Sequence, residues 1–179
     1  NTAAEINEQF VRENGVRVVR RLSGGGAVYH DMGNLNFTFI ADAGDMESIN
    51  FRLFCRPVVT ALAKIGVTAE INGRNDMTID GQKFSGNSQY LKEGRVMHHG
   101  TIMFDSNLDL VAQALHVDQE KIRAKGIASV RSRVTTVRRH MASPVTLEEF
   151  RSLLLREILE QQPGDEYVFT EEDKAQIAQ

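Results

Sequence analysis

Residues 76–104 read DMTIDGQKFSGNSQYLKEGRVMHHGTIMF and contain two turn signals, Asp80-Gly81 and Glu93-Gly94. An acidic residue followed by glycine is typical of a two-residue hairpin turn, because both positions need a left-handed backbone. The runs on either side, Asp76 to Ile79 and Val96 to Phe104, have the composition of strands. The middle of the chain is therefore predicted to form consecutive antiparallel strands.

Helical patterns flank these hairpins. Apolar spacing and capping signals predict helices from the Thr2 and Glu5 capping box to Asn14-Gly15, over 49–66 with a kink or break at Pro57, over 108–115, and a last one opening at Thr146 and Glu149. Further strands are predicted at 16–20, 35–39 and 68–71. Strands in the middle with helices around them indicate an α+β fold with a mixed or antiparallel β-sheet.

Composition narrows the functional classes. The chain has 179 residues and a net charge of −3, which argues against binding nucleic acid through bulk charge. A single cysteine, Cys55, excludes an internal disulfide and a cysteine-rich zinc site. The sequence has no apolar run of the roughly 18 residues that a membrane span needs, and we expect a cytoplasmic protein without a membrane partner. The chain begins with Asn1, and we expect that upstream sequence is missing.

The segment from Arg20 to Asp31, with the glycines Gly24, Gly25 and Gly26, carries the strongest chemical signal. Three consecutive glycines leave backbone amides uncovered, and nearby arginines offer donors to phosphate oxygens, so the segment suits an anion or nucleotide cradle. It is not the dinucleotide-binding fingerprint, because Tyr29 stands where the third glycine belongs. A plain glycine turn that joins two strands is an equally good reading from composition alone.

Two further basic features could bind an anion, and each could also be a solvated surface charge. Lys83 lies just past the Asp80-Gly81 turn, where it could reach a carboxylate and a phosphate while Asp76 orients it or serves a metal ion; a solvated surface lysine is the alternative. Residues 123–139 hold six cations and no acidic residue, which suggests a loop that closes over an anion. Nucleic-acid binding is the rival there, but no aromatic residue is interleaved to stack on bases. A solvated basic face is the other alternative for this run.

The histidines and the cysteine give weaker signals. His98 and His99 are neighbours on a predicted strand, so they should point to opposite faces and cannot chelate one ion together. His30 and His99 are better interpreted as pocket or core residues than as metal ligands. Cys55 sits between apolar helical positions, where a buried and inert thiol is expected.

Five segments, in this order, resemble the motifs of lipoate–protein ligases: residues 20–36, Gly73 to Asp76, Lys83 to Asn87, His98 to Thr101 and Lys125 to Val134. The resemblance runs nearly from end to end and implies the catalytic-domain fold that these enzymes share with biotin ligases. It implies a catalytic domain over residues 1–163, incomplete at its N-terminus, and a linker over 164–179 toward an absent C-terminal domain.

The resemblance also implies a reaction. Such an enzyme joins free lipoate to ATP, giving lipoyl-AMP and pyrophosphate, and then transfers the lipoyl group to a lysine of a carrier domain. The carriers would be lipoyl domains of 2-oxoacid dehydrogenase complexes or the glycine cleavage H protein.

Site residues follow from the same match. The nucleotide would be held by Arg21, Gly26, Ala27, Val28, Tyr29 and Lys83, together with a loop that orders over the adenylate and comprises Ser129, Val130, Arg131, Ser132, Arg133 and Val134. Lipoate would contact Lys83, Ser23, Gly25, His30, Asn34 and His99, and Lys83 would bridge its carboxylate and the α-phosphate. Mg²⁺ is expected on the phosphates, with Asp76 as the protein ligand beside it.

Two other functions stay open. An octanoyl or lipoyl acyltransferase of the same superfamily would use a cysteine thioester without ATP, but Cys55 within a helix fits that role poorly. A non-catalytic module that binds lipoate or a nucleotide is the other.

Overall fold

The computed structural model describes residues 5–44, 50–73, 75–115, 133–161 and 163–178. Its centre is a five-stranded sheet of order β1-β5-β4-β3-β2, in which every neighbouring pair is antiparallel. The strands are β1 (Asn34–Asp42), β2 (Glu70–Asn72), β3 (Asp76–Ile79), β4 (Gln82–Lys92) and β5 (Arg95–Met103). The α+β class with an antiparallel sheet is thereby confirmed.

Both predicted hairpin turns are present. Asp80 and Gly81 have φ of 50° and 75°, and Glu93 and Gly94 have φ of 51° and 74°. Two consecutive residues with positive φ match the right-handed twist of the flanking strands. The turns therefore set the register in which β4 pairs with β3 on one side and with β5 on the other.

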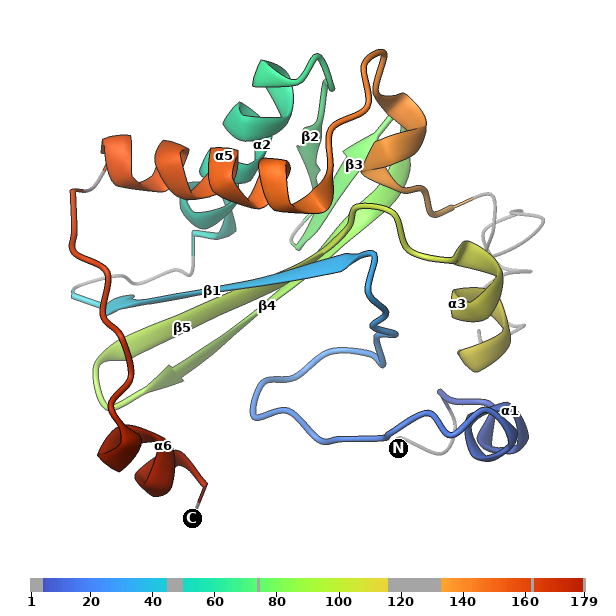
Figure 1. Ribbon diagram of the computed structural model, residues 1–179, viewed down its shortest axis with the longest axis horizontal. Helices are drawn as coiled ribbons and strands as arrows, with labels where there is room; N and C mark the ends of the chain where they lie inside the picture. The colour runs from blue at the N-terminus through green and yellow to red at the C-terminus, as the bar shows by residue number, and fades with distance from the viewer. Residues whose placement is uncertain (1–4, 45–49, 74, 116–132, 162, 179) are drawn as a thin grey trace.

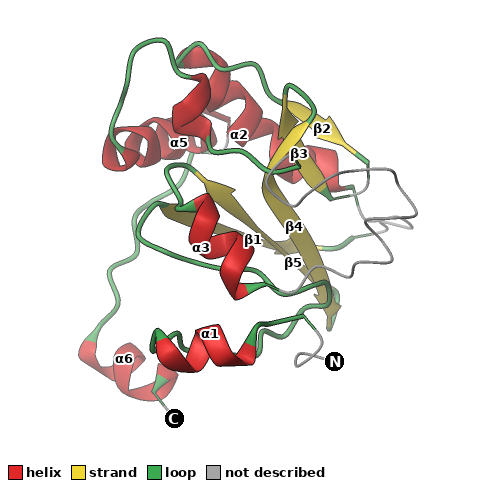
Figure 2. Cartoon of the chain, turned by 90° about the vertical axis from the view of Figure 1, so that its right-hand side faces the viewer, coloured by secondary structure: helices red, strands yellow, loops and turns green. Residues whose placement is uncertain are grey.

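Helices cover the two faces of the sheet unequally (Figure 1). Helices α2 (Phe51–Lys64) and α5 (Leu147–Gln161) pack on one face, and the core between them and the strands includes Val58, Leu62, Phe84, Ile102 and Phe150. On the other side lie the short helices α1 (Glu8–Glu13) and α3 (Leu108–Ala114) together with the segment that precedes β1 (Figure 2). We call this second side of the sheet the open face.

Strand β5 shows how the two faces differ. His98 is fully buried and points into the core, and its neighbour His99 is half-buried on the open face. The prediction that the two histidines point to opposite faces is confirmed, because side chains alternate along a strand. Thr38 of β1 and Ser88 of β4 lie opposite His99, so the open face is polar where the core face is apolar.

A β-bulge sets the side chains of β4. Met77 pairs with Ser85, whereas Thr78 pairs with Lys83, so Phe84 is an extra residue in β4. The bulge lets Phe84 and Ser85 both be buried while Lys83 stays half-exposed on the open face. Bulges commonly re-aim side chains next to active sites.

Several predicted elements need correction. Helix α1 begins at Glu8 with Asn7 as its N-cap, because the Asn7 side chain accepts the amide of Phe10; Glu5 is therefore not a capping residue of a helix, and Thr2 lies outside the described residues. Residues 16–20 form no strand: Val19 is 87% exposed, and the segment runs beside the open face rather than within the sheet (Figure 1). β-branched residues favour extended backbone, but a strand also needs a paired neighbour.

The remaining differences concern the helices. Pro57 does not divide the predicted helix into two, since α2 runs through it and Pro57 is buried in the packing against the core. The capping box of Thr146 and Glu149 is confirmed at the start of α5, but α5 is not the last helix. A 3₁₀ helix (Val137–His140) precedes it, and α6 (Glu171–Ile177) follows within the segment predicted as a linker. The division into a catalytic domain and a linker stays a prediction. None of the helices in the described ranges combines the length and apolar character that spanning a lipid bilayer requires.

Candidate functional site

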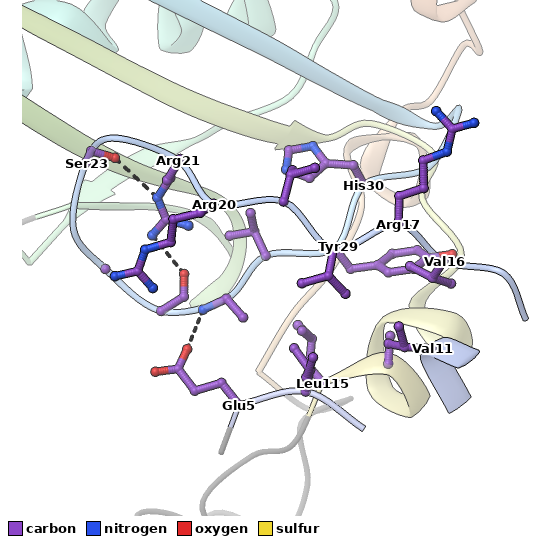
Figure 3. A pocket seen from close by; sticks show the side chains of 18 of the residues that line it. Glu5, Val11, Val16, Arg17, Arg20, Arg21, Ser23, Tyr29, His30 and Leu115 are labelled. Atoms are coloured by element: carbon purple, nitrogen blue, oxygen red, sulfur yellow. Dashed lines mark hydrogen bonds between the residues drawn. The ribbon is translucent and has the colours of Figure 1, made fainter. Parts of the chain in front are cut away.

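A cavity of about 600 Å³ lies between the open face and the short helices (Figure 3). One wall is residues 21–30, which we call the glycine loop. The opposite wall is formed by Ile6, Val11, Val16, Ala114 and Leu115, and the lining also includes Glu5, Arg17, Val18, Val19, Arg20 and Asn36. The cavity therefore combines an apolar wall with a rim of cations and backbone polar groups, a combination that suits an anionic ligand with an apolar portion.

Arg21 organises the glycine loop from within. Its Nη2 donates to the carbonyl oxygens of Gly24 and Gly26, at 2.8 Å each, and its Nε donates to Ser23 Oγ at 3.2 Å. Gly25 has a φ of +104°, and a Cβ there would lie 2.8 Å from Arg21 Nη2. A side chain at position 25 would therefore strain the backbone and push against the Arg21 guanidinium.

Two hydrogen bonds fasten the loop to the sheet. Ser23 Oγ lies 2.5 Å from His99 Nε2, and Ser88 Oγ donates to the carbonyl of Gly24 at 3.0 Å. Burial lowers the pKa of His99, and the charge of Arg21 lowers it further. A neutral His99 can accept the Ser23 hydroxyl hydrogen at Nε2, which leaves Ser23 Oγ free to accept from Arg21.

Lys83 forms an ion pair at the neighbouring position of the open face. Its Nζ lies 2.7 Å from Asp76 Oδ1, and both side chains are more than a third exposed. A Cβ on Gly86 would lie 3.1 Å from Lys83 Nζ, so the lysine folds over the glycine. Ser88, which anchors the glycine loop, is two residues after Gly86 in β4, a distance of about 7 Å at the usual rise of a strand.

The backbone of Lys83 contacts the end of the predicted adenylate loop. Its amide donates to the carbonyl of Arg133 at 2.7 Å, its carbonyl accepts from Thr135 at 2.9 Å, and it pairs with Val134 in a parallel bridge. The Nε and Nη2 atoms of Arg133 are buried without a hydrogen-bond partner in the described part of the protein. Ser129, Val130, Arg131 and Ser132 lie outside the described residues.

Two asparagines, Asn75 just before β3 and Asn87 in β4, hold the strands that carry Asp76 and Lys83 together. Asn87 Nδ2 donates to the carbonyl of Asn75 at 3.1 Å, and Asn75 Nδ2 donates to the carbonyl of Asn87 at 3.3 Å. A Cβ on Gly100 would lie 2.2 Å from Asn87 Oδ1, so this glycine makes room for the amide. The reciprocal bonds fix the start of β3, and hence Asp76, against β4.

The C-terminal end of the glycine loop is fixed as well. Asn34 Nδ2 lies 3.1 Å from His30 Nδ1 and donates to Asn36 Oδ1 at 2.9 Å. Burial lowers the pKa of His30. Asp31 accepts from the amides of Gly33 and Asn107, at 3.0 and 2.8 Å, and so joins the end of the loop to the start of α3.

The structure thus brings together most of the residues that the sequence singles out, in two adjoining groups. The cavity is lined by Arg21, Ser23, Gly25, Gly26, Ala27, Val28, Tyr29 and His30. Lys83 and Asp76 form the second group beside it and do not line the cavity. Sequence reasoning missed Glu5, which also lines the cavity, and Ser88. Simple alternation along β4 would place Ser88, five residues after Lys83, on the opposite face, and only the bulge at Phe84 brings both to the open face; the local sequence therefore carried no signal for Ser88.

The side chains that the structure describes do not by themselves make a metal centre. Within the described ranges, no group of three or more His, Cys, Asp or Glu residues is arranged to hold a metal ion. Asp76 supplies one carboxylate, whose Oδ1 already lies beside Lys83. A magnesium ion here would take its other oxygen ligands from bound phosphates and water, as is usual for this ion.

Comparison with known proteins identifies relatives over nearly the whole chain. The family model for the lipoyl protein ligase A/B catalytic domain matches residues 1–159. The lipoate-protein ligase LplJ of Bacillus subtilis is 53% identical over 183 residues, which cover 100% of this chain and 55% of that protein. The chain therefore spans about half the length of this curated relative.

Solved structures agree with the sequence match. A bi-partite lipoate protein ligase from an archaeal lipoylation system of Thermoplasma acidophilum, described with its E2 lipoyl domain, has a TM-score of 0.83 at 31% identity, covering 97% of this chain and 69% of that one. Lipoate-protein ligase A bound with ATP gives 0.77 at 25% identity, covering 97% and 70%. A biotin protein ligase from Aquifex aeolicus gives 0.51 at 18% identity, covering 72% and 51%, which shows a common fold and confirms that expectation.

Proposed function

Since the chain belongs to the family of lipoyl protein ligase A/B catalytic domains, we propose that it is the catalytic part of an enzyme that activates lipoate with ATP and transfers the lipoyl group to a lysine of a carrier domain. The single observation that carries this proposal is the position of Lys83, a half-exposed cation that folds over Gly86, two residues before the Ser88 that anchors the arginine-organised glycine loop. A carboxylate and a triphosphate repel each other, so a site that joins them needs a fixed cation beside donors for both.

In the first half-reaction, a carboxylate oxygen of lipoate attacks the α-phosphorus of ATP. The bond from the α-phosphorus to the oxygen bridging to the β-phosphate breaks, pyrophosphate leaves, and lipoyl-AMP remains. Lys83 Nζ would exchange part of its contact with Asp76 for the lipoate carboxylate and an α-phosphate oxygen. The ATP-bound structure of a relative supports the nucleotide, and the apolar wall beside the glycine loop suits the hydrocarbon part of lipoate.

In the second half-reaction, a neutral lysine amine of the carrier attacks the acyl carbon of lipoyl-AMP. An amide bond forms, the bond from the acyl carbon to the phosphate oxygen breaks, and AMP and a proton are released. The E2 lipoyl domain of the archaeal lipoylation system supports a lipoyl domain as the acceptor. The open face is the side on which this acceptor must approach, because α2 and α5 cover the other side of the sheet.

Asp76 is the residue that would hold Mg²⁺ together with the phosphates, and the ion would neutralise charge on the pyrophosphate that leaves. Lys83 and Asp76 are both partly exposed, so an ion and phosphate oxygens can reach the pair. Arg17, Arg20 and Arg21 are among the residues that line the cavity, and their charges would offset the remaining phosphate charge.

The position of Cys55 disfavours the acyltransferase alternative. Cys55 is the chain's one cysteine, is 1% exposed in α2, and belongs to the core on the other face of the sheet from Lys83. Burial raises the pKa of its thiol to about 11. A thioester nucleophile needs an accessible thiolate, and neither condition holds at Cys55.

The decisive experiment is ATP–pyrophosphate exchange with the complete protein, with and without lipoate. We expect exchange that requires lipoate, followed by covalent lipoylation of an added lipoyl domain, detected by intact-mass spectrometry. Lipoylation from an acyl-carrier thioester without ATP would support the acyltransferase function, and binding of lipoate or ATP without exchange would support a non-catalytic module.

A further inference from the structure

We propose that Glu5 is a positioning residue that, together with Arg21, fixes the orientation of one peptide bond in the glycine loop. The proposal deepens the proposed function, since it takes the loop to be the nucleotide-binding element. Glu5 lies before α1 and far from the loop in sequence, and nothing in the family motifs quoted above includes it.

The geometry is that of a peptide held at both ends (Figure 3). The amide of Ala27 donates to Glu5 Oε2 at 2.5 Å. The carbonyl of Gly26 accepts from Arg21 Nη2 at 2.8 Å. This carbonyl and this amide belong to the same peptide plane, so an anion binds its N–H end and a cation binds its oxygen end. Hydrogen bonds to charged groups are the stronger kind, and here they act in concert.

The loop needs such a restraint. Gly24, Gly25 and Gly26 follow one another, and glycine populates backbone regions that other residues avoid. Rotation of the Gly26–Ala27 peptide would exchange the positions of its N–H and C=O groups, so that the carbonyl oxygen would face the Glu5 carboxylate and the N–H would face the Arg21 guanidinium. Fixing the peptide before the ligand arrives removes that ordering cost from binding.

Glu5 itself is anchored. The next residue, Ile6, forms a bridge with Leu115, and the amide of Asn7 donates to the carbonyl of Ala114 at 2.9 Å. A Cβ on Gly26 would lie 3.3 Å from Glu5 Oε2, so the carboxylate packs directly on the loop. The backbone that carries Glu5 is thus tied to α3, and the carboxylate holds the loop against that support.

A rival account gives the same contact another meaning. The Glu5 carboxylate would stand where a phosphate oxygen binds the Ala27 amide, and nucleotide would have to displace it. When the negative charge is removed and an acceptor is kept, the proposal predicts a nearly unchanged KM for ATP and the rival predicts a lower one, and this difference defines the test.

The test compares four variants in the complete protein: Glu5→Ala, Glu5→Gln, Glu5→Asp and, as a matched control, Glu8→Ala, which removes an exposed carboxylate from the first turn of α1. Hydrogen exchange at the Ala27 amide is measured without ligand, and KM for ATP and kcat are measured in lipoate-dependent pyrophosphate exchange. Glu5→Gln keeps an acceptor at the same reach, whereas Glu5→Asp keeps the charge but is one methylene too short.

We expect exchange at Ala27 to be at least tenfold faster in Glu5→Ala and Glu5→Asp, and KM for ATP to rise at least fivefold with kcat changed less than twofold. Glu5→Gln should restore KM to within twofold of the original protein, and Glu8→Ala should match it. If Glu5→Gln and Glu5→Ala both lower KM, Glu5 is a competing anion and the proposal is wrong; equal KM values in all variants refute it as well.

The hydrogen-exchange arm separates this proposal from the proposed function. If the original protein shows no pyrophosphate exchange, the ligase assignment fails, and the amide data on the ligand-free variants still decide whether Glu5 holds the peptide. Should Glu5→Ala not fold, Glu5→Asp carries the comparison, and an unchanged exchange rate at Ala27 in that variant overturns the proposal.

Discussion

His98 should make the stability of the fold depend on pH below neutrality. The imidazole is fully buried and stacks on Phe54, with ring centroids 4.9 Å apart, and its Nδ1 lies 2.9 Å from Gln89 Nε2. Its Nε2 is buried without a partner in the described part of the protein. A charged imidazolium is costly there, and burial lowers the pKa of His98 to about 4. The substitution to make is His98→Leu.

The sign and size follow from linkage. The unfolded chain binds a proton at this histidine near pH 6.5, and the folded protein binds it only near pH 4, so the unfolded state binds more protons between these values. The contribution of His98 to the free energy of unfolding is therefore fully present above pH 6.5 and is lost as the pH falls toward 4. At pH 5 the loss relative to pH 7.5 comes to about 2 kcal/mol from His98 alone.

Urea denaturation at pH 7.5 and at pH 5.0 measures the effect, with the original protein and His98→Leu compared at each pH. The variant is expected to be less stable at pH 7.5, because it leaves the half-buried amide of Gln89 without its partner, but its stability should fall by about 2 kcal/mol less on acidification. Other titrating groups contribute equally to both proteins and cancel in the difference. An identical fall in both proteins would show that His98 does not titrate as its burial requires.

Three further predictions concern the site and its surroundings. Lys83→Ala should reduce lipoate-dependent pyrophosphate exchange at least about a hundredfold, the usual cost of losing one preorganised charge in an active site; near-normal exchange would remove Lys83 from the mechanism. Cys55→Ser should lower the free energy of unfolding by about 1–2 kcal/mol and leave lipoyl transfer intact, and a folded variant without transfer would revive the thioester mechanism. Gly25→Ala should destabilise the protein by about 1–3 kcal/mol in urea denaturation, through its positive φ and the clash with the Arg21 guanidinium. Gly24→Ala is the matched control, because its Cβ would meet nothing within 4 Å, and equal losses in both variants would contradict the packing argument.

Local sequence predicted the sheet well because its determinants are local. Asp80-Gly81 and Glu93-Gly94 set the hairpins within a few residues of the strands they join. The prediction of a strand over 16–20 was wrong for the opposite reason. The β-branched composition of this segment indicates which backbone conformation it prefers, but no short-range signal tells whether another strand lies alongside. The predicted start of α1 was wrong because the sequence offers two capping signals, the Thr2 and Glu5 capping box and the Asn7 cap, and only the second is used.

The candidate site shows the same division. Arg21, Gly25 and Lys83 stand in compact motifs, and the sequence alone was enough to single them out. The contact of Glu5 with Ala27 spans 22 positions and joins two segments that share no pattern. The β-bulge at Phe84, which decides that Lys83 faces the open side, depends on pairing with β3 and leaves no mark on the composition of β4.

Alternate residues of each strand face either the packed side or the open side of this sheet, so neighbouring positions tolerate substitutions for different reasons. Packing in the core limits which side chains can replace Ile102 or His98, whereas contacts on the open face limit what can replace His99 or Ser88. Substitutions at every second residue along these strands can therefore change the chemistry of the open face without rebuilding the core.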